Sequence, residues 1–321
     1  MTQSPLTNAN MAYRQLSINT LVPNRQAGVK LFLRTGKNSF VLFINTTSHI
    51  SAAKLEQLQQ NNVKHLYLNT TDQQGYLNYL KENLSAILSN PELTDNDKAE
   101  IIYDTASSIT EDLFLKPSTN GIKQTRNLVN CMIDTISHSP KTSKLLMMIT
   151  SQDYYTYTHS INVGIYAISM MRKVKPSISD TELKTLGLGF FLHDLGKTRI
   201  PNTIINKQGP LDQFEWQLMQ EHPMLGVELV HKMGEESPAI TDIILTHHER
   251  NCGSGYPGKL TRNEISLPGK ICALCDVFDA LTTKRPYKKA LSTFESLKLM
   301  KNEHREQFDM ELLNQFIILF T

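Results

Sequence analysis

The chain lacks the long apolar run of a membrane-spanning helix and any strong excess of one charge. No segment approaches the roughly 20 consecutive apolar residues that such a helix requires. The polar start, MTQSPLTNANMAYRQ, has no apolar core of a signal peptide. A formal net charge of +2 is too small to imply nucleic-acid binding by itself. We therefore expect a cytoplasmic protein that binds neither a membrane nor nucleic acid.

Cysteines are also few, with four in 321 residues, and this number does not suggest a disulfide framework. Cys272 and Cys275 form a C-x-x-C, but they lie inside an apolar helical pattern and no second pair accompanies them. This context favours core thiols over a metal or redox site. The length of the chain suits two domains better than one core.

The N-terminal region predicts a small α/β module. Residues 29–34 (VKLFLR) and 39–45 (SFVLFIN) are rich in β-formers and flank TGKN, which is typical of a hairpin. The segment SAAKLEQLQQNN predicts a helix with Ser51 as its N-cap, and VKHLYLN predicts a strand after it. We assign residues 1–90 to a regulatory module. It contains no glycine-rich phosphate loop and no metal cluster, and its residues do not indicate what it senses.

Beyond residue 90 the apolar residues recur at helical spacing almost to the end of the chain. Residues 91–150 predict a helical linker whose first helix is capped by Asp95, and the helices around 92–135 could pair two subunits in a homodimer. Residues 151–321 predict an all-α bundle. The fold class is therefore α+β, with the small module followed by the helical part.

Several local signals divide the helical part. Gly196 is placed to stop the helix that ends in HDLGK. Asp212 and Glu215 form a capping-box pattern, and Pro223 opens the next helix. In LPGKICALCDVFDALTT the apolar residues share one face of a helix, and Asp276 points away from it.

Histidines and aspartates beside apolar helices indicate a metal centre. His193 and Asp194 follow the apolar FFL, and burying ionisable side chains there is costly unless something pairs with them. His247 and His248 form a second adjacent pair, and Asp276 lies in a third helix. Each residue alone is more often a core or surface side chain, but together they are hard to explain by packing. Imidazole and carboxylate are natural ligands of zinc, manganese and iron, and a carboxylate can bridge two ions.

The motifs HDLGK, EHP, HHERNCGSGYP and CDVFDALTTKRPYKKA follow one another in this order. With them, residues 151–300 resemble the HD-GYP family, a branch of the HD-domain metal-dependent phosphohydrolases. The resemblance implies an all-α fold with a metal cluster and, as the usual substrate, the bacterial second messenger cyclic di-GMP.

The resemblance also implies a ligand set for two divalent transition-metal ions, bridged by Asp194. A set rich in nitrogen and oxygen and free of thiolate suits iron or manganese and does not exclude zinc. The implied ligands of the first ion are His159, His193, Asp194 and Asp276. Those of the second are Asp194, His222, His247 and His248.

The implied reaction is hydrolysis of a 3'-5' phosphodiester by a hydroxide that bridges the two ions. Asp194 and Lys197 are the expected catalytic residues, with Lys197 near the scissile phosphate. A second reading of Lys197, as a cation that stabilises a helix end, is compatible with the first. Arg285 and Lys288 lie where the family grips the phosphates of the dinucleotide.

The GYP loop and its surroundings complete the expected site. Gly255 and Tyr256 are candidate substrate contacts, and a purely structural loop is an equally favoured alternative. Asp279 is expected to orient a metal ligand. Two positions depart from the family pattern: Tyr155 replaces a glutamate that binds a third ion in some members, and Cys252 replaces an aspartate of the usual DGxGYP.

Three functions remain open. The first is a cyclic di-GMP phosphodiesterase regulated by the N-terminal module. The second is a weakly active or inactive sensor or scaffold that binds the dinucleotide, or GGDEF-domain proteins, through the GYP loop; the departures at Cys252 and Tyr155 favour it, and the intact ligand set argues against it. The third is a phosphohydrolase acting on another nucleotide, including a mixed cyclic dinucleotide.

Overall fold

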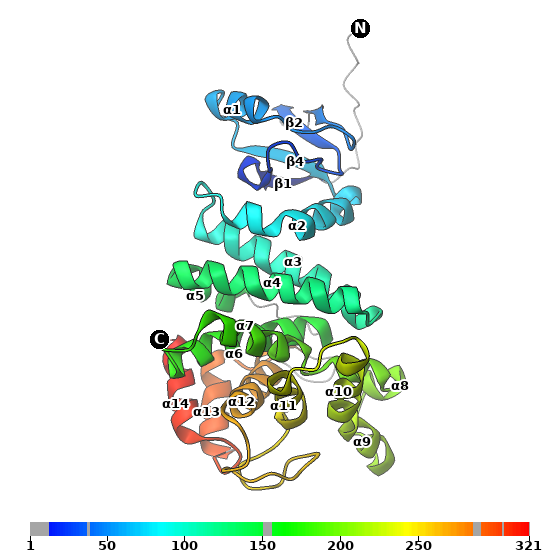
Figure 1. Cartoon of the computed structure of the whole chain (residues 1–321), viewed down its shortest axis with the longest axis vertical. Helices are drawn as coiled ribbons and strands as arrows, with labels where there is room; N and C mark the ends of the chain where they lie inside the picture. The colour runs from blue at the N-terminus through cyan, green and yellow to red at the C-terminus, as the bar shows by residue number, and fades with distance from the viewer. Residues whose placement is uncertain (1–12, 37–38, 150–155, 285–289, 304, 321) are drawn as a thin grey trace. The chain divides into compact units, whose positions relative to one another are not determined.

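The chain divides into two compact units, Met1–Thr105 and Ala106–Thr321, and the boundary falls inside helix α3 (Asp95–Leu115). The division at residues 90 and 150 that the sequence favours remains a prediction. The computed structural model (Figure 1) describes residues 13–36, 39–149, 156–284, 290–303 and 305–320.

The first unit contains a four-stranded antiparallel sheet in the order β1-β4-β2-β3. The predicted hairpin is confirmed as β2 and β3, and Leu31 and Leu68 face each other in the register of β2 and β4, both fully buried. Strand β1 and helix α2 were not singled out in the sequence. The elements are β1 (Tyr13–Ser17), β2 (Leu31–Gly36), β3 (Ser39–Ile44), β4 (His65–Asn69), α1 (Ala52–Gln60) and α2 (Gln73–Leu88).

Helix starts in this part of the chain follow local side-chain caps. Ser51 caps α1 as predicted, because its side-chain oxygen accepts a hydrogen bond from the backbone N–H of Lys54 at 3.3 Å. At α3 the prediction was wrong by one residue. Thr94 and Asp97 accept hydrogen bonds from each other's backbone N–H at 3.1 Å, so Thr94 is the cap and Asp95 lies in the first turn.

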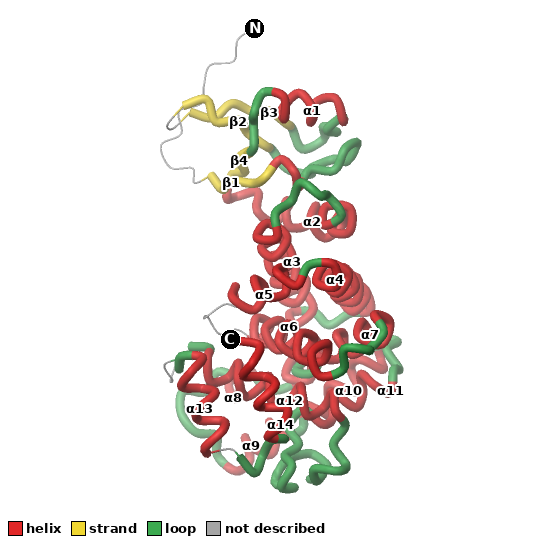
Figure 2. The backbone as a smooth tube through the Cα atoms, turned by 90° about the vertical axis from the view of Figure 1, so that its left-hand side faces the viewer, coloured by secondary structure: helices red, strands yellow, loops and turns green. Residues whose placement is uncertain are grey.

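The second unit consists of helices and loops in its described residues (Figure 2), which confirms the α+β class. Within the described residues, no helix is both long and apolar enough to span a bilayer. The α-helices of this unit after α3 are α4 (Thr119–His138), α5 (Pro140–Ile149), α6 (Thr156–Val174), α7 (Asp180–Leu192), α8 (Asn202–Ile205), α9 (Gln213–Gln220), α10 (His222–Lys232), α11 (Pro238–Thr246), α12 (Leu267–Thr282), α13 (Thr293–Glu303) and α14 (Met310–Ile317).

The core of the second unit lies where α7 packs against α6 and α11, while α12 packs against α6 and α11. Phe190, Phe191 and Leu192 at the end of α7 are fully buried. Burying each such side chain contributes roughly 1.5–3 kcal/mol. A β-carbon on Gly164 of α6 would collide with the Phe191 ring, so glycine permits the close approach of α6 to α7. This packing holds the end of α7, and the residues after it, inside the unit.

Gly196 does not have the role expected from the sequence. Helix α7 already ends at Leu192, and Gly196 lies in the following 3-10 turn, η3 (Leu195–Arg199). A β-carbon on Gly196 would lie only 2.5 Å from the backbone nitrogen of Gly226 and would overlap the carbonyl of His222. Glycine is therefore required for η3 to touch α10, which sets Asp194 beside His222.

Candidate metal centre

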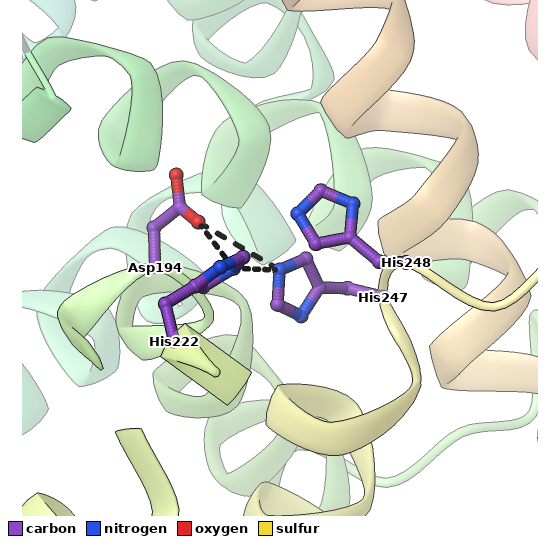
Figure 3. A group of neighbouring side chains, drawn as sticks. All are labelled: Asp194, His222, His247 and His248. Atoms are coloured by element: carbon purple, nitrogen blue, oxygen red, sulfur yellow. Dashed lines mark hydrogen bonds and ion pairs between the residues drawn. The ribbon is translucent and has the colours of Figure 1, made fainter. Parts of the chain in front are cut away.

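The predicted ligands converge on two overlapping groups of atoms that share Asp194. Within each group the coordinating atoms all lie within 4.8 Å of one another. One group is Asp194, His222, His247 and His248, shown in Figure 3. The other is His159, His193 and Asp194, with Asp276 in contact with His159.

Most of these side chains are presented at the ends of buried helices. Helix α11 carries a buried apolar stripe of Ile240, Ile243 and Ile244, and its last turn leads directly into His247 and His248. The capping box of Asp212 and Glu215 starts α9, as predicted. The remaining ligands lie after α7 (His193, Asp194), at the start of α10 (His222, followed by Pro223), in α6 (His159) and in α12 (Asp276).

The carboxylate of Asp194 lies between the two groups and is fully buried. Its Oδ1 lies 3.3 Å from Nε2 of His222 and 3.7 Å from Nε2 of His247. Its Oδ2 lies 3.5 Å from Nε2 of His159 and 2.6 Å from Nζ of Lys197. One oxygen therefore faces each group, which is the arrangement that a bridging carboxylate needs.

Three imidazoles are held in one tautomer by the backbone. Nδ1 of His193, His222 and His247 lies 2.8, 2.7 and 2.7 Å from the carbonyl oxygen three residues earlier. A carbonyl oxygen can only accept, so Nδ1 carries a proton, and in the neutral ring Nε2 then presents its lone pair to the centre. Fixing the ring through its other nitrogen is the usual support of a metal-binding histidine.

Some acceptors at the centre have no donor among the described residues. Nε2 of His193 and Oδ1 of Asp194 are buried, and no described residue donates a hydrogen bond to either atom. Nε2 of His222 and Nε2 of His247 lie 3.1 Å apart, although neither carries a proton in the tautomer that the backbone imposes. Buried acceptors that face one another are costly unless a cation lies between them. The donor set therefore fits bound metal ions.

His159 is held from the opposite side by carboxylates. Its Nε2 lies 3.0 Å from Oδ1 of Asp276, and its Nδ1 lies 2.7 Å from Oδ2 of Asp279. Asn162 donates to the other oxygen of Asp279 at 2.8 Å. Asp279 thus contacts His159 and Asp276 points into the cluster from α12, while the role of Asp279 in orienting a metal ligand stays a prediction.

Burial and charge set the protonation of the ligands. Burial lowers the pKa of His193 to about 3 and holds that of His248 well below its usual value. Burial would raise the pKa of Asp194, but Lys197 and the surrounding imidazoles outweigh it and hold this pKa well below its usual range. His193 and His248 are therefore neutral and Asp194 is ionised at neutral pH, as metal ligands must be.

His159 is the exception. Burial opposes its charge, but its bonds to Asp276 and Asp279 prevail and raise the pKa of His159 to about 10. Without a cation, His159 carries the positive charge that offsets these two carboxylates, and it must release a proton before Nε2 can bind a metal.

The loop after α11 is tied to the centre by Glu249, a residue that the sequence reading missed. Glu249 is buried, and its carboxylate accepts hydrogen bonds from the backbone N–H of Gly258 at 2.6 Å and of Leu260 at 2.9 Å. A β-carbon on Gly255 would lie 2.6 Å from the carbonyl oxygen of His248, so glycine lets this loop fold back on the ligand pair. The sequence signal that could have indicated Glu249 is its position directly after His247 and His248.

The ring of Tyr256 packs against two of the candidate metal ligands. The ring centroids of Tyr256 and His248 are 4.7 Å apart with planes 31° from parallel, and His222 lies 6.3 Å away. Trp216 of α9 contacts Tyr256 in turn, with its ring 5.9 Å from that of Tyr256 and the two planes at 80°. Trp216 was not singled out in the sequence, although it is the only tryptophan of the chain.

Among the described residues, the cysteines are not members of the two candidate ligand groups. Cys272 and Cys275 are fully buried in α12, and burial raises their thiol pKa well above the usual value, in keeping with core thiols. Cys252 is exposed, and its hydrogen bond with Ser254 lowers the pKa of its thiol. The other predicted positions, Tyr155, Arg285 and Lys288, lie outside the described residues.

Comparison with known proteins identifies relatives that match more than half of this chain. A cyclic di-GMP phosphodiesterase of Pseudomonas aeruginosa is 35% identical over 190 residues, which cover 58% of this chain and 45% of that protein. A 3'3'-cGAMP-specific phosphodiesterase of Vibrio cholerae is 33% identical over 58% of this chain and 36% of its own length. The matches thus span less than half the length of these relatives.

A solved structure shares the fold. Bd1817, described as an HDG"Y"P protein of Bdellovibrio bacteriovorus, matches with a TM-score of 0.66 and 18% identity, covering 97% of this chain and all of that one. Residues 143–312, more than half of the chain, match the HD domain family. The relationship that the motifs indicate is thereby confirmed, and the chain belongs to the HD domain family.

Proposed function

We propose that this protein is a cyclic di-GMP phosphodiesterase that hydrolyses a 3'-5' phosphodiester at a two-metal centre and is regulated by its N-terminal module. The observation that carries the proposal is the position of Asp194, whose two oxygens face separate groups of imidazoles. A shared carboxylate between two sets of inward lone pairs is what two cations a few ångströms apart require.

The proposed ligands fall into two sets joined by Asp194. Bound cations would activate water and neutralise the charge that develops on the phosphoryl oxygens. Iron or manganese suits the oxygen and nitrogen ligands best, and zinc is a further candidate. The first set is His159, His193, Asp194 and Asp276, and the second is Asp194, His222, His247 and His248.

Other side chains of the chain have proposed roles in binding and orientation. Lys197 keeps Asp194 ionised and brings a positive charge to the centre, where it can contact a phosphoryl oxygen. Burial, with the charges of Asp276 and Asp194, raises the pKa of Tyr256, so its phenol stays protonated and can donate a hydrogen bond to the substrate.

Three more residues complete the proposal. Asp279 holds the ring of His159 in place. Arg285 and Lys288 are proposed to bind the substrate phosphates, and this assignment rests on the family resemblance.

The relatives support the substrate class and leave a second candidate. The Pseudomonas aeruginosa relative is named for cyclic di-GMP, whereas two Vibrio cholerae relatives at 33% and 32% identity are named for 3'3'-cGAMP. A mixed cyclic dinucleotide is therefore the second candidate substrate. Pairing of two subunits and docking of GGDEF-domain proteins on the GYP loop are further proposals.

The test is to purify the protein anaerobically with ferrous iron or manganese, measure bound metal, and follow cyclic di-GMP and 3'3'-cGAMP by chromatography. Asp194→Ala should lose metal and more than about 100-fold in rate, because even residues that only support a ligand change activity about 10- to 100-fold. Asp180→Ala, at an exposed acid of α7, is the matched control. Tight binding of the dinucleotide without hydrolysis by metal-loaded protein would contradict the enzyme and favour the sensor.

A further inference from the structure

A column of aromatic rings leads from the metal centre to the protein surface. Its inner members are the imidazoles of His222 and His248, Tyr256 covers them, and Trp216 is the outer member. Trp216 leaves 46% of its surface exposed. The column therefore ends in a large aromatic ring that solvent can reach, two ring contacts away from candidate metal ligands.

The surface around Trp216 contains further exposed apolar side chains. Phe214, in the same helix, is 67% exposed, and Met224, in the first turn of α10, is 49% exposed. Among the described residues the ring of Phe214 contacts no member of the column, whereas the ring of Trp216 packs against Tyr256. An exposed aromatic ring that is held in position is a feature of binding sites for flat ligands, because stacking then costs little conformational entropy.

The chemistry of the proposed substrate matches this arrangement. A cyclic dinucleotide joins negatively charged phosphodiesters to flat purine bases, and the metal centre accounts only for the phosphodiester. A base needs a π surface close to the phosphate site, and aromatic side chains provide one. In the described part of the chain, the column through Tyr256 provides such a surface beside the ligand histidines.

We propose that the indole face of Trp216, which Tyr256 holds in an edge-to-face contact, is the platform on which one guanine base of the cyclic dinucleotide stacks while its phosphodiester lies at the metal centre. This inference rests on the proposed function and adds to it the residue that recognises the base. Trp216 touches no candidate ligand, so it contributes to binding of the substrate and leaves the chemistry at phosphorus unchanged.

The single tryptophan allows a direct test of contact. Metal-loaded protein is titrated with the hydrolysis-resistant bisphosphorothioate analogue of cyclic di-GMP while tryptophan emission is recorded, and dimethyl phosphate serves as a probe without a base. Saturable quenching by the analogue and none by dimethyl phosphate would support the platform. If the analogue competes with cyclic di-GMP for the site but leaves the emission unchanged, the proposal is wrong.

Substitutions test the energetic contribution. Trp216→Ala should raise KM for cyclic di-GMP by about 5- to 150-fold, the range expected for loss of one base stack. Its kcat should be unchanged, as should its rate with methyl p-nitrophenyl phosphate, a diester without a nucleobase. Trp216→Phe should restore most of the affinity. Phe214→Ala, at the exposed neighbour in α9, is the matched control and should behave as the unmodified protein.

Two results separate the failure of this inference from that of the proposed function. An equal loss with both substrates in Trp216→Ala would show that the indole merely supports Tyr256, and this would overturn the platform while leaving the enzyme intact. If the unmodified protein hydrolyses neither substrate, the proposed function fails. The fluorescence titration still decides whether a guanine base stacks on Trp216.

Discussion

One buried polar network in each unit shows opposite ways of burying polar groups. In the first unit, the hydroxyl of Tyr76 donates to Thr20 Oγ1 at 3.0 Å, and Tyr79 donates to the carbonyl of Thr20 at 3.2 Å. The same Tyr79 hydroxyl accepts from the backbone N–H of Val22 at 2.7 Å. In the second unit, His193 Nε2 and Asp194 Oδ1 are buried acceptors to which no described residue donates. The first network is neutral and satisfied, and the second is charged and incomplete.

The pKa values express the same difference. Burial raises the pKa of Tyr76 to about 12, which only strengthens the neutral form that the phenol has anyway. Burial lowers the pKa of His193 to about 3, while Asp194 beside it stays ionised. A satisfied network stabilises the fold by itself. The incomplete one would gain stability from bound cations, so the contrast marks the unit that contains the candidate metal centre.

The largest effect is expected at the glycine that joins η3 to α10. Gly196→Ala should lower the free energy of unfolding by about 3 kcal/mol or more, since the new β-carbon meets backbone atoms that cannot rotate away. It should also separate Asp194 from His222 and abolish metal binding. Gly36→Ala in the first unit, where the added β-carbon would meet only Ser39 at 3.5 Å, should leave metal content unchanged. Urea unfolding and metal analysis measure both, and normal metal binding in Gly196→Ala would contradict the geometry.

Removal or addition of metal should change the stability of the second unit and leave that of the first unit unchanged. A cation present at 100 times its dissociation constant stabilises the state that binds it by about 2.7 kcal/mol. Hydrogen exchange should therefore slow in α7, α10 and α11 when manganese is added to metal-free protein, and should not change in the sheet of the first unit. Equal protection of both units would show that metal acts on the whole chain and not on the incomplete network.

A smaller effect is expected from the buried carboxylate that holds the GYP loop. Glu249→Gln keeps one acceptor for Gly258 or Leu260 but loses the charge, and should cost about 1–2 kcal/mol. Because the loop carries Tyr256, KM for the dinucleotide should rise while metal content is kept. Glu264→Gln is the control, since Glu264 is an exposed acid that bonds Thr261 in the same loop. Unchanged KM in Glu249→Gln would mean that the loop holds its shape without this carboxylate.

The sequence predicted what depends on local signals. The hairpin of β2 and β3, the Ser51 cap and the Asp212–Glu215 capping box each involve residues a few positions apart, and each is confirmed. Strand β1 was missed because YRQLS has little β pattern of its own and pairs with β4, which lies about fifty residues further along the chain.

The residues of the candidate site also separate into those that local patterns indicate and those whose partners are distant in the sequence. The His193–Asp194 and His247–His248 pairs were visible because ionisable residues follow apolar helices. The order of the motifs then linked them to a family. Gly196 was misread as a helix stop because its constraint comes from α10. Trp216 was missed because its partner, Tyr256, is forty residues away in the sequence. Contacts of this kind cannot be derived from spacing along the chain.

The smallest effect is expected in the satisfied network. Tyr76→Phe removes one hydrogen bond to Thr20, whose hydroxyl keeps its bond to the carbonyl of Ser17 at 2.8 Å. The free energy of unfolding should fall by about 0.5–1.5 kcal/mol, the net contribution of one such bond. Metal content and hydrolysis should not change, because no acceptor in the second unit loses a partner. Thermal unfolding and metal analysis of this variant check both statements. A loss of bound metal in Tyr76→Phe would show that the two networks are coupled. The satisfied network of the first unit and the incomplete network of the second could then no longer be treated as independent.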